Sequence, residues 1–373
     1  MNRHPIRVLF LQSHLKVGGS QRQIADLVGL LDPSRFEPTI CCVREAGEFG
    51  EELRAAGFRV YSDLLAFEFD IRVISRIAEI ITREKIDILL AVGPNRTVVV
   101  GYLAALAARL KKTVVALHST FAPNGGKITG APTRWALRRV SRIVMVAHAQ
   151  KRTVCAREGI NPARVTVIHN GIPLSRLNSI DPLTYAQVGI PVSRPRVVGI
   201  VGRLVPEKDH RMFLRAAKLI CGALSDVFFL VVGDGPEQSG LERLAHEWGI
   251  ADRVRFLGNL NPVTRVLPLL DVGVLSSYTE SFPVSVLEIM AFKKPVVVTD
   301  VGGLREMVDD EVEGFVVPPR DAHSLAERIR ILLEDKERAA SMGVLAQLRV
   351  EREWTAERMS KEFEQLFYEV YCS

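Results

Sequence analysis

Short apolar runs alternate with amphipathic stretches along the first half of this chain. The runs typical of buried strands span 6–11, 38–43, 86–92, 113–118, 142–146 and 165–168. Helical periodicity appears near 20–31, 71–84, 95–110 and 148–158. Strand–helix alternation predicts a parallel sheet with helices on both faces. Such sheets bind ligands at the carboxyl ends of their strands, so the loops there are the first place to look for chemistry.

A turn-rich break, His-Asn-Gly-Ile-Pro at 169–173, precedes a polar stretch containing Pro182, Pro191 and Pro195. A second alternation follows, with strands expected at 196–201, 227–232, 254–257, 271–275 and 295–299. Its expected helices span 207–222, 236–248, 283–292 and 321–334. The pattern predicts an α/β protein of two Rossmann-like domains, 1–173 and 174–350, facing a central cleft.

The tail 351–373 carries an apolar stripe at helical spacing: Trp354, Met359, Phe363, Leu366, Phe367 and Val370. The stripe predicts one helix with a buried side. From the residues alone, this helix packs either on the second domain or back on the first.

Composition places the 373-residue chain among globular proteins, with 47% apolar and 25% charged residues. The start of the chain does not resemble a signal peptide, and no apolar run reaches the roughly 20 residues that span a bilayer. Five cysteines without metal-ligand spacing predict reduced thiols, and Cys41 and Cys42 should point to opposite faces of one strand. We expect a cytoplasmic protein.

Charge is distributed unevenly between the two halves. Residues 1–180 contain 26 Lys and Arg against 14 Asp and Glu, whereas the remainder contains 23 against 29. A basic first half predicts an anionic partner such as a membrane surface or a pyrophosphate-linked acceptor. Without zinc-finger spacing or aromatic-rich basic motifs, nucleic acid is not expected. The densest basic region, with Trp135 and Leu137 adding apolar area, fits a membrane contact or simply a solvated face; its cations are Arg134, Arg138, Arg139, Arg142, Lys151, Arg152 and Arg157.

The stretch 276–303 is the richest in candidate chemistry. Glu280 follows an expected strand, Pro283 suits the first turn of the next helix, and Glu288 lies within that helix. A helix N-terminus directly after a strand offers free N–H groups and a partial positive charge, which suits phosphate. Both acids could therefore face one pocket of sugar size, although two glutamates eight positions apart also occur by chance.

Other loops at expected strand ends could contribute to the same pocket. Arg203 and Lys208 follow the first strand of the second domain and would form a clamp for a leaving diphosphate. After the first strand of the chain, Gly18 and Gly19 would let the backbone approach a ligand, with Ser20 capping the following helix. The loop lacks the Gly-Lys-Ser/Thr ending of a Walker A motif and the third glycine of the dinucleotide fingerprint.

The motif formed by two glutamates resembles the nucleotide-sugar site of retaining glycosyltransferases of family 4. In this motif Glu280 is followed by Ser-Phe-Pro, and seven residues separate it from Glu288. Gly-Arg-Leu followed by Glu207-Lys208 resembles that family's basic pair, although Asp209 stands where the family often has glycine. The resemblance implies the GT-B fold, with the last helix crossing back to the first domain.

The resemblance also implies a role for each matching residue. Glu288 would hold the ribose hydroxyls, Glu280 the donor-sugar hydroxyls, and His118 would approach the donor sugar. Arg203 and Lys208 would stabilise the departing diphosphate. Donor binding would further involve Gly18, Gly19, Gly202, Asp234, Gly235, Leu257, Gly258, Ser281, Phe282, Pro283 and Val284.

The predicted reaction is transfer of a sugar from a nucleotide-diphosphate donor to an acceptor hydroxyl with retention of configuration. We expect no cofactor and no metal, because no Asp-x-Asp pair occurs in the expected cleft segments. A glycan or lipid-linked acceptor in cell-surface polysaccharide synthesis is implied by the resemblance, with possible contact to an anionic membrane. Two alternatives are a nucleotide-sugar epimerase of the same fold and a non-catalytic two-domain sugar-binding protein.

Overall fold

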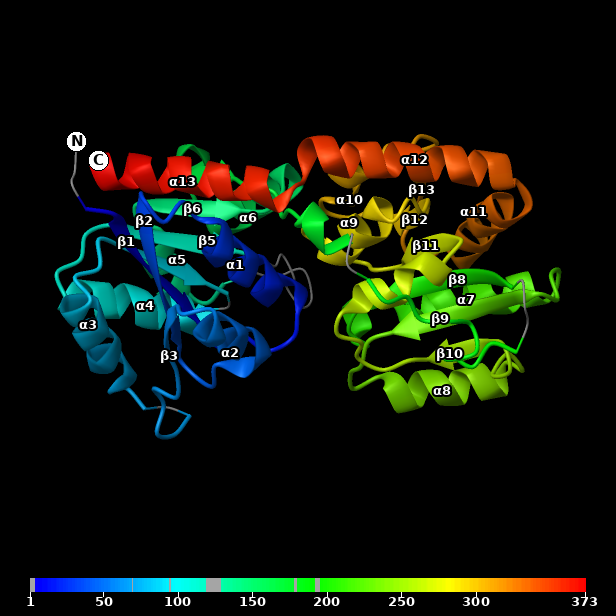
Figure 1. Ribbon diagram of the computed structural model, residues 1–373, viewed down its shortest axis with the longest axis horizontal. Coiled ribbons are helices and arrows are strands. Elements are labelled where there is room, and N and C mark those ends of the chain that lie inside the picture. Colours follow the sequence, from blue (N-terminus) through cyan, green and yellow to red (C-terminus); the bar gives the residue numbers. More distant parts are fainter. Residues whose placement is uncertain (1–3, 69, 94, 119–128, 178–179, 192–194) are drawn as a thin grey trace. The chain divides into compact units, whose positions relative to one another are not determined.

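The computed structural model describes residues 4–68, 70–93, 95–118, 129–177, 180–191 and 195–373. The chain forms two compact units. Unit 1 comprises residues 1–171 together with 356–373, and unit 2 comprises 172–355. Figure 1 labels most elements of each unit, and the units are described separately below.

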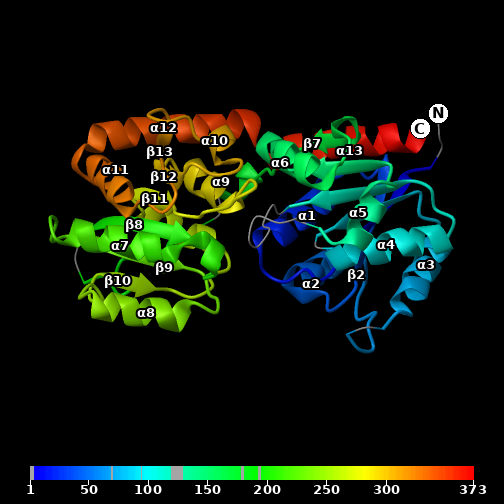
Figure 2. The same cartoon turned by 180° about the vertical axis from the view of Figure 1, so that it is seen from behind.

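Unit 1 is built on a parallel seven-stranded sheet of order β3-β2-β1-β4-β5-β6-β7. Its strands are β1 (Ile6–Gln12), β2 (Phe36–Cys42), β3 (Arg59–Tyr61), β4 (Ile88–Val92), β5 (Thr113–Leu117), β6 (Arg142–Met145) and β7 (Val165–Val167). One face packs against α1 (Gly19–Leu30), α2 (Gly47–Ala55) and α13 (Ala356–Cys372). The other face packs against α3 (Val73–Arg83), α4 (Asn95–Ala107), α5 (Ala131–Leu137) and α6 (His148–Glu158), which are labelled in Figure 2.

Unit 2 repeats this plan with a parallel six-stranded sheet of order β10-β9-β8-β11-β12-β13. Its strands are β8 (Arg196–Val201), β9 (Val227–Val232), β10 (Val254–Phe256), β11 (Val272–Leu275), β12 (Val296–Thr299) and β13 (Gly314–Val317). Its helices are α7 (His210–Cys221), α8 (Gln238–Glu247), α9 (Val284–Ala291), α10 (Leu304–Met307), α11 (Ala322–Glu334) and α12 (Lys336–Glu353). Strand order reverses beside β8 and β11, which places ligand-binding loops at their carboxyl ends.

The strands predicted from apolar runs are confirmed to within two residues, and β8 and β9 match at both ends. Two strands were not predicted. The three residues of β3 are half-buried or exposed because β3 is an edge strand, so no apolar run marks it. β13 follows the acidic turn before Gly314 and has only four residues. The helices α2, α5, α10 and α12 were also missed.

Helix α13 belongs to the core of unit 1. Phe367 contacts three aromatic rings there, at centroid distances of 6.0 Å to Phe10, 6.1 Å to Phe36 and 5.8 Å to Phe363. Glu364 accepts a hydrogen bond of 2.8 Å from the Asp32 backbone N–H. The C-terminal helix therefore crosses back to the first unit, as the resemblance implied, and the crossing follows Thr355.

The cysteine prediction is confirmed for Cys41 and Cys42, which lie buried in the cores on opposite faces of the unit 1 sheet. All five cysteines are free thiols, although Cys372 is exposed. Burial raises the pKa of the Cys42 thiol to about 12, so this group stays protonated and unreactive near pH 7. Across the described residues, no helix combines the length and the apolar character needed to cross a bilayer.

Candidate functional site

Backbone hydrogen bonds tie three strand-end loops of unit 2 into one surface. The N–H of Gly202 donates to the carbonyl of Val232 at 2.9 Å, and that of Leu204 to the carbonyl of Asp234 at 2.7 Å. Gly233 in turn donates to the carbonyl of Gly258 at 2.8 Å. The loops after β8, β9 and β10 thus meet, and they contain the predicted residues Gly202, Arg203, Asp234, Gly235, Leu257 and Gly258.

Two glycines allow these loops to come so close. Gly233 has φ +134°, and a Cβ there would lie 2.1 Å from the carbonyl oxygen of Gly202. Gly235 has φ +156°, with the carbonyl oxygen of Leu204 at 2.3 Å from the corresponding position. Any side chain would force the β8 and β9 loops apart. The Gly-Asp-Gly sequence is therefore required by packing as well as available to a ligand.

Lys208 and Glu280, predicted from separate motifs, form a direct ion pair. Nζ of Lys208 lies 2.5 Å from Oε1 of Glu280, and the side chains are only 16% and 10% exposed. The hydroxyl of Ser277 donates to the same carboxylate oxygen at 2.7 Å. A carboxylate that is held by a cation and a hydroxyl is fixed in direction. It is suited to accepting hydrogen bonds from sugar hydroxyls.

The loop that carries Glu280 is fixed from several sides. The hydroxyl of Ser276 donates to the carbonyl of Asp209 at 2.9 Å, and the N–H of Tyr278 donates to the carbonyl of Glu207 at 3.0 Å. Thr299 in β12 donates its hydroxyl to the carbonyl of Ser277 at 2.5 Å. The segment with Lys208 and the segment with Glu280 are therefore bonded to each other before any ligand arrives.

Arg203 lies apart from this ion pair. Its side chain is 73% exposed, and its guanidinium lies 3.8 Å from the carboxylate of Glu207. That pair is solvent-exposed and weak. Arg203 thus remains free to turn toward an anion, whereas Lys208 is already positioned.

Helix α9 begins at Val284, and Pro283 is its N-cap residue rather than its first helical residue as predicted. No side chain caps this end. Ser281 and Phe282 are buried, and the Phe282 ring packs edge-on against Trp354 at 5.5 Å. Glu288 is half-buried within the helix. A helix N-terminus without a side-chain cap offers N–H donors to phosphate oxygens, although the N–H of Val286 already donates to the carbonyl of Pro283 at 3.3 Å.

In unit 1, the glycine pair lies at the carboxyl end of β1. Gly18 is the N-cap residue of α1, and Gly19 is the first residue of the helix. The predicted cap by Ser20 is wrong: this residue lies inside the helix, and its hydroxyl donates to the side-chain oxygen of Gln21 at 3.0 Å. The N-terminus of α1 therefore also lacks a side-chain cap.

His118 follows β5 in the same unit, as predicted. Both ring nitrogens are shielded from solvent and have no hydrogen-bond partner among the described residues. Burial lowers the pKa of this imidazole to about 4, so it is neutral near pH 7. A buried, unsatisfied imidazole at a strand's carboxyl end is suited to a ligand hydroxyl. From its three glycines and its proline, we expect the segment 119–130 to be a loop that contacts the acceptor, and most of it lies outside the described residues.

Sequence reasoning missed the roles of two residues that shape the site. Ser277 supports Glu280, but no local signal distinguishes it from other serines in the loop. Asp209 has the left-handed φ of +46° and accepts a hydrogen bond of 3.1 Å from the Met212 N–H, which caps α7. The glycine that the family often has at this position was the available clue, because glycine adopts this conformation without strain.

The comparisons with known proteins agree with this architecture. The family model described as Glycosyltransferase Family 4 matches residues 17–176, and the model Glycosyl transferases group 1 matches 186–349. The fold is that of the GT-B glycosyltransferases, with two Rossmann-like units. The two models together cover most of both units, and the chain belongs to glycosyltransferase family 4.

Three relatives illustrate the range of this similarity. A 2-deoxystreptamine glucosyltransferase of Streptomyces kanamyceticus is 31% identical over 61% of this chain, and the match spans 59% of that enzyme's own length. An Escherichia coli UDP-Gal:alpha-D-GlcNAc-diphosphoundecaprenol alpha-1,3-galactosyltransferase is 25% identical over 89% of each chain. Anabaena HepE, solved in complex with UDP-glucose, superposes with a TM-score of 0.84 at 22% identity over 98% of this chain and 100% of its own.

Proposed function

We propose that this chain transfers a sugar from a nucleotide-diphosphate sugar to an acceptor hydroxyl, with retention of configuration and without a divalent metal. The observation that carries the proposal is the Lys208–Glu280 ion pair at the carboxyl end of β11 in a family 4 chain. It provides a fixed cation for a leaving phosphate and a fixed carboxylate for a sugar in one place.

The proposed step breaks the bond between the anomeric carbon and the phosphate oxygen. A new bond forms from that carbon to the acceptor oxygen, and the phosphate oxygen takes the acceptor's proton on the same face of the sugar. Lys208, Arg203 and the N-terminus of α9 offset the negative charge that builds on the diphosphate. Glu280 orients the sugar through hydrogen bonds from its hydroxyls.

For the donor, uridine diphosphate sugars are the first to test, because the galactosyltransferase relative is named for UDP-Gal and HepE was solved with UDP-glucose. Thermal-shift titration with UDP, GDP and ADP and their sugars should single out one diphosphate. Glu288→Ala should weaken its binding by about 1–3 kcal/mol, since ribose hydroxyls would lose a charged acceptor. The exposed Glu334→Ala in α11 is the control. Equal affinity in both variants would remove Glu288 from the site.

For the acceptor, we propose a glycan or a lipid-linked sugar at the inner face of the membrane, in cell-surface polysaccharide synthesis. The diphosphoundecaprenol in the name of the Escherichia coli relative supports a lipid-linked acceptor. Activity should survive EDTA, and NMR of the product should give the anomeric configuration of the donor. Strict dependence on Mg²⁺ or Mn²⁺, or an inverted product, would overturn the mechanism.

A nucleotide-sugar epimerase of the same fold is the alternative that a reaction assay must exclude. It would use the same donor loops but would interconvert the nucleotide sugar without any acceptor. Incubation with donor alone should therefore leave the sugar unchanged. Appearance of a new nucleotide sugar would favour the epimerase, and binding without turnover under any condition would favour a sugar-binding protein.

A further inference from the structure

The positive charge of the first half is confined to one segment. Residues 95–171 contain 13 lysines and arginines and a single acid, Glu158, whereas residues 1–94 contain 12 against 13. Glu158 adds no negative charge to the surface, because its side chain is fully buried and accepts hydrogen bonds from the N–H and hydroxyl of Thr129. The segment therefore presents cations to solvent without any exposed carboxylate of its own.

Helices α4, α5 and α6 of this segment cover the same face of the unit 1 sheet and point their outer sides away from it (Figure 2). The guanidinium of Arg138, just after α5, packs against Gly159 at the C-terminus of α6, which makes the surface continuous. We call this surface the basic face and define it by its exposed residues Leu106, Trp135, Arg138, Arg139, Arg152 and Arg157.

The basic face also exposes large apolar side chains. Leu106 is 50% and Trp135 is 39% exposed. The Trp135 ring packs edge-on against Tyr102 at 5.3 Å, and the guanidinium of Arg139 lies 4.7 Å from its centroid. Leu137, expected from sequence to add apolar surface, is instead fully buried. A tryptophan and a leucine among arginines are typical of a surface at the water–bilayer interface.

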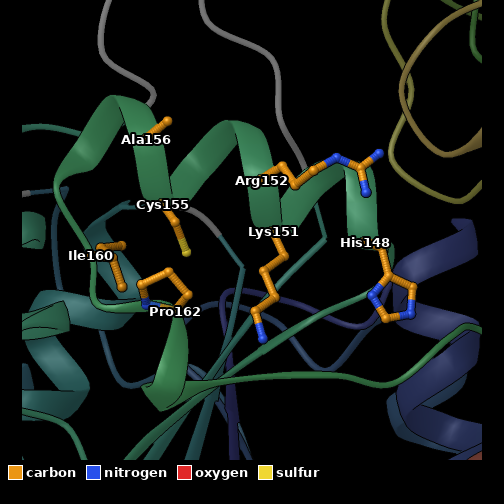
Figure 3. A pocket seen from close by; sticks show the side chains of 7 residues that line it. All are labelled: His148, Lys151, Arg152, Cys155, Ala156, Ile160 and Pro162. Atoms are coloured by element: carbon orange, nitrogen blue, oxygen red, sulfur yellow. The ribbon is translucent and has the colours of Figure 1, made fainter.

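A cavity of about 510 Å³ lies beside α6 (Figure 3). Apolar parts of Cys155, Ile160 and Pro162 line it, with Lys151 and Arg152 beside them. The Lys151 amine donates to the carbonyl of Val165 at 2.7 Å, which uses one of its three protons. Cations around an apolar hollow match the phosphate and first carbons of a lipid better than they match a purely polar polyanion.

We infer that the basic face docks on an anionic lipid bilayer, with Trp135 and Leu106 entering the headgroup region. The inference deepens the proposed membrane contact by naming its surface. Complementary charge attracts the face to phospholipid, and the apolar side chains distinguish a bilayer from nucleic acid.

The test is cosedimentation of the full-length protein with vesicles, without donor, so that its outcome is independent of glycosyl transfer. Vesicles of phosphatidylglycerol and phosphatidylcholine should bind the protein, salt should weaken binding, and pure phosphatidylcholine should not bind. The variant Arg138→Gln/Arg152→Gln/Arg157→Gln should lose roughly 100-fold in partitioning, because each cation at the surface contributes about fivefold.

The control Arg44→Gln/Arg54→Gln/Arg83→Gln removes equal charge from residues 1–94 of unit 1, where each of these arginines pairs with a carboxylate. It should bind vesicles within about threefold of the parent, since those cations are already neutralised. Equal loss in both variants would show that net charge, rather than the basic face, drives binding and would overturn the inference.

Tryptophan fluorescence supplies a second readout. Trp135 is the most exposed of the three tryptophans, so anionic vesicles should shift its emission to the blue, and Trp135→Phe should remove the shift while binding persists. Trp135→Ser/Leu106→Ser should bind more weakly than Leu219→Ser/Leu345→Ser, which removes exposed apolar side chains of unit 2. Tighter binding to duplex DNA than to vesicles, or no blue shift, would overturn the assignment to a bilayer.

Discussion

The direction of the Glu280 side chain depends on Gly302, a residue of a different loop. A Cβ at Gly302 would lie 1.7 Å from the carbonyl oxygen of Glu280, and the glycine has φ +54°. Gly302→Ala must therefore move the Glu280 backbone, and we expect at least a tenfold loss of transfer activity with about 1–3 kcal/mol lower stability. The loss of activity is measured as kcat for sugar transfer, and the loss of stability is measured by urea unfolding.

The matched control for that substitution is Gly240→Ala in helix α8. No atom lies within 4 Å of a Cβ there, and φ is not positive. Alanine should leave activity unchanged and raise stability by up to about 1 kcal/mol. If Gly302→Ala keeps full activity, the loop does not need its present position and the role of Glu280 must be revised.

The Lys208–Glu280 ion pair can be separated into a structural and a chemical contribution. Lys208→Met leaves a nearly buried carboxylate without its cation, which should cost about 3 kcal/mol of unfolding free energy and at least 100-fold in kcat. The double variant Lys208→Met/Glu280→Gln should recover much of the stability, because no charge is then stranded, yet remain inactive. Recovery of activity together with stability would show that Lys208 only serves to neutralise Glu280.

These residues also mark how far sequence reading reaches at this scale. Two pairs of site residues could be proposed because the members of each pair lie close together in the chain. These pairs are Arg203 with Lys208 and Glu280 with Glu288. The contact of Gly302 with Glu280 could not be proposed, since it joins the loops after two different strands. Its Gly-Gly sequence was visible, but the partner that requires it was not.

At the scale of single elements, Asp209 connects the Lys208 loop to helix α7. It holds the left-handed conformation at a cost of about 1 kcal/mol and offsets it by capping the Met212 N–H. Asp209→Gly should therefore change the unfolding free energy by less than about 1 kcal/mol. Asp209→Ala keeps the backbone strain and removes the hydrogen bond that caps α7. It should therefore lower the free energy of unfolding by about 1–2 kcal/mol, as measured by urea titration. Equal effects of the two substitutions would exclude this account.

Two of the elements that were not predicted, β3 and α12, lack the hydrophobic pattern that would have marked them. Strand β3 lies at a sheet edge and buries no side chain fully, so it has no apolar run. Helix α12 exposes Val344, Leu345 and Leu348 on its outer side, which blurs the periodicity that would have marked it. Central strands such as β8 and β9 are buried on both faces, and their continuous apolar runs fixed their boundaries.

At the scale of the whole molecule, unit 1 is completed by a distant part of the chain, whereas unit 2 is one continuous segment, 172–355. Unit 1 needs α13, whose aromatic residues fill the face of its sheet. The path leaves unit 1 after Gly171, where the Gln23 amide makes two buried hydrogen bonds of 2.8 Å to the backbone of that glycine. Ile172 already belongs to unit 2, where its N–H donates to the carbonyl of Trp354 at 3.0 Å. Hydrogen bonds therefore fix the chain on both sides of the point where it leaves unit 1, at Gly171 and at Ile172.

Each unit also contains a histidine whose ring nitrogens are shielded from solvent and have no partner among the described residues: the half-buried His118 in unit 1 and the buried His210 in unit 2. Burial lowers the pKa of both imidazoles to about 4 from an ordinary value of 6.5. The unfolded chain therefore binds more protons between these values, and stability must fall as pH decreases from 6.5 toward 4. At pH 5 each histidine should remove on the order of 2 kcal/mol.

Urea unfolding at pH 7.5 and pH 5 measures this loss, and His210→Gln isolates one share of it. Glutamine does not titrate, so the variant should lose less stability than the parent over the same interval, by on the order of 2 kcal/mol. If His210→Gln loses as much stability as the parent over this interval, His210 is protonated in the folded protein and its neutral, buried state is wrong.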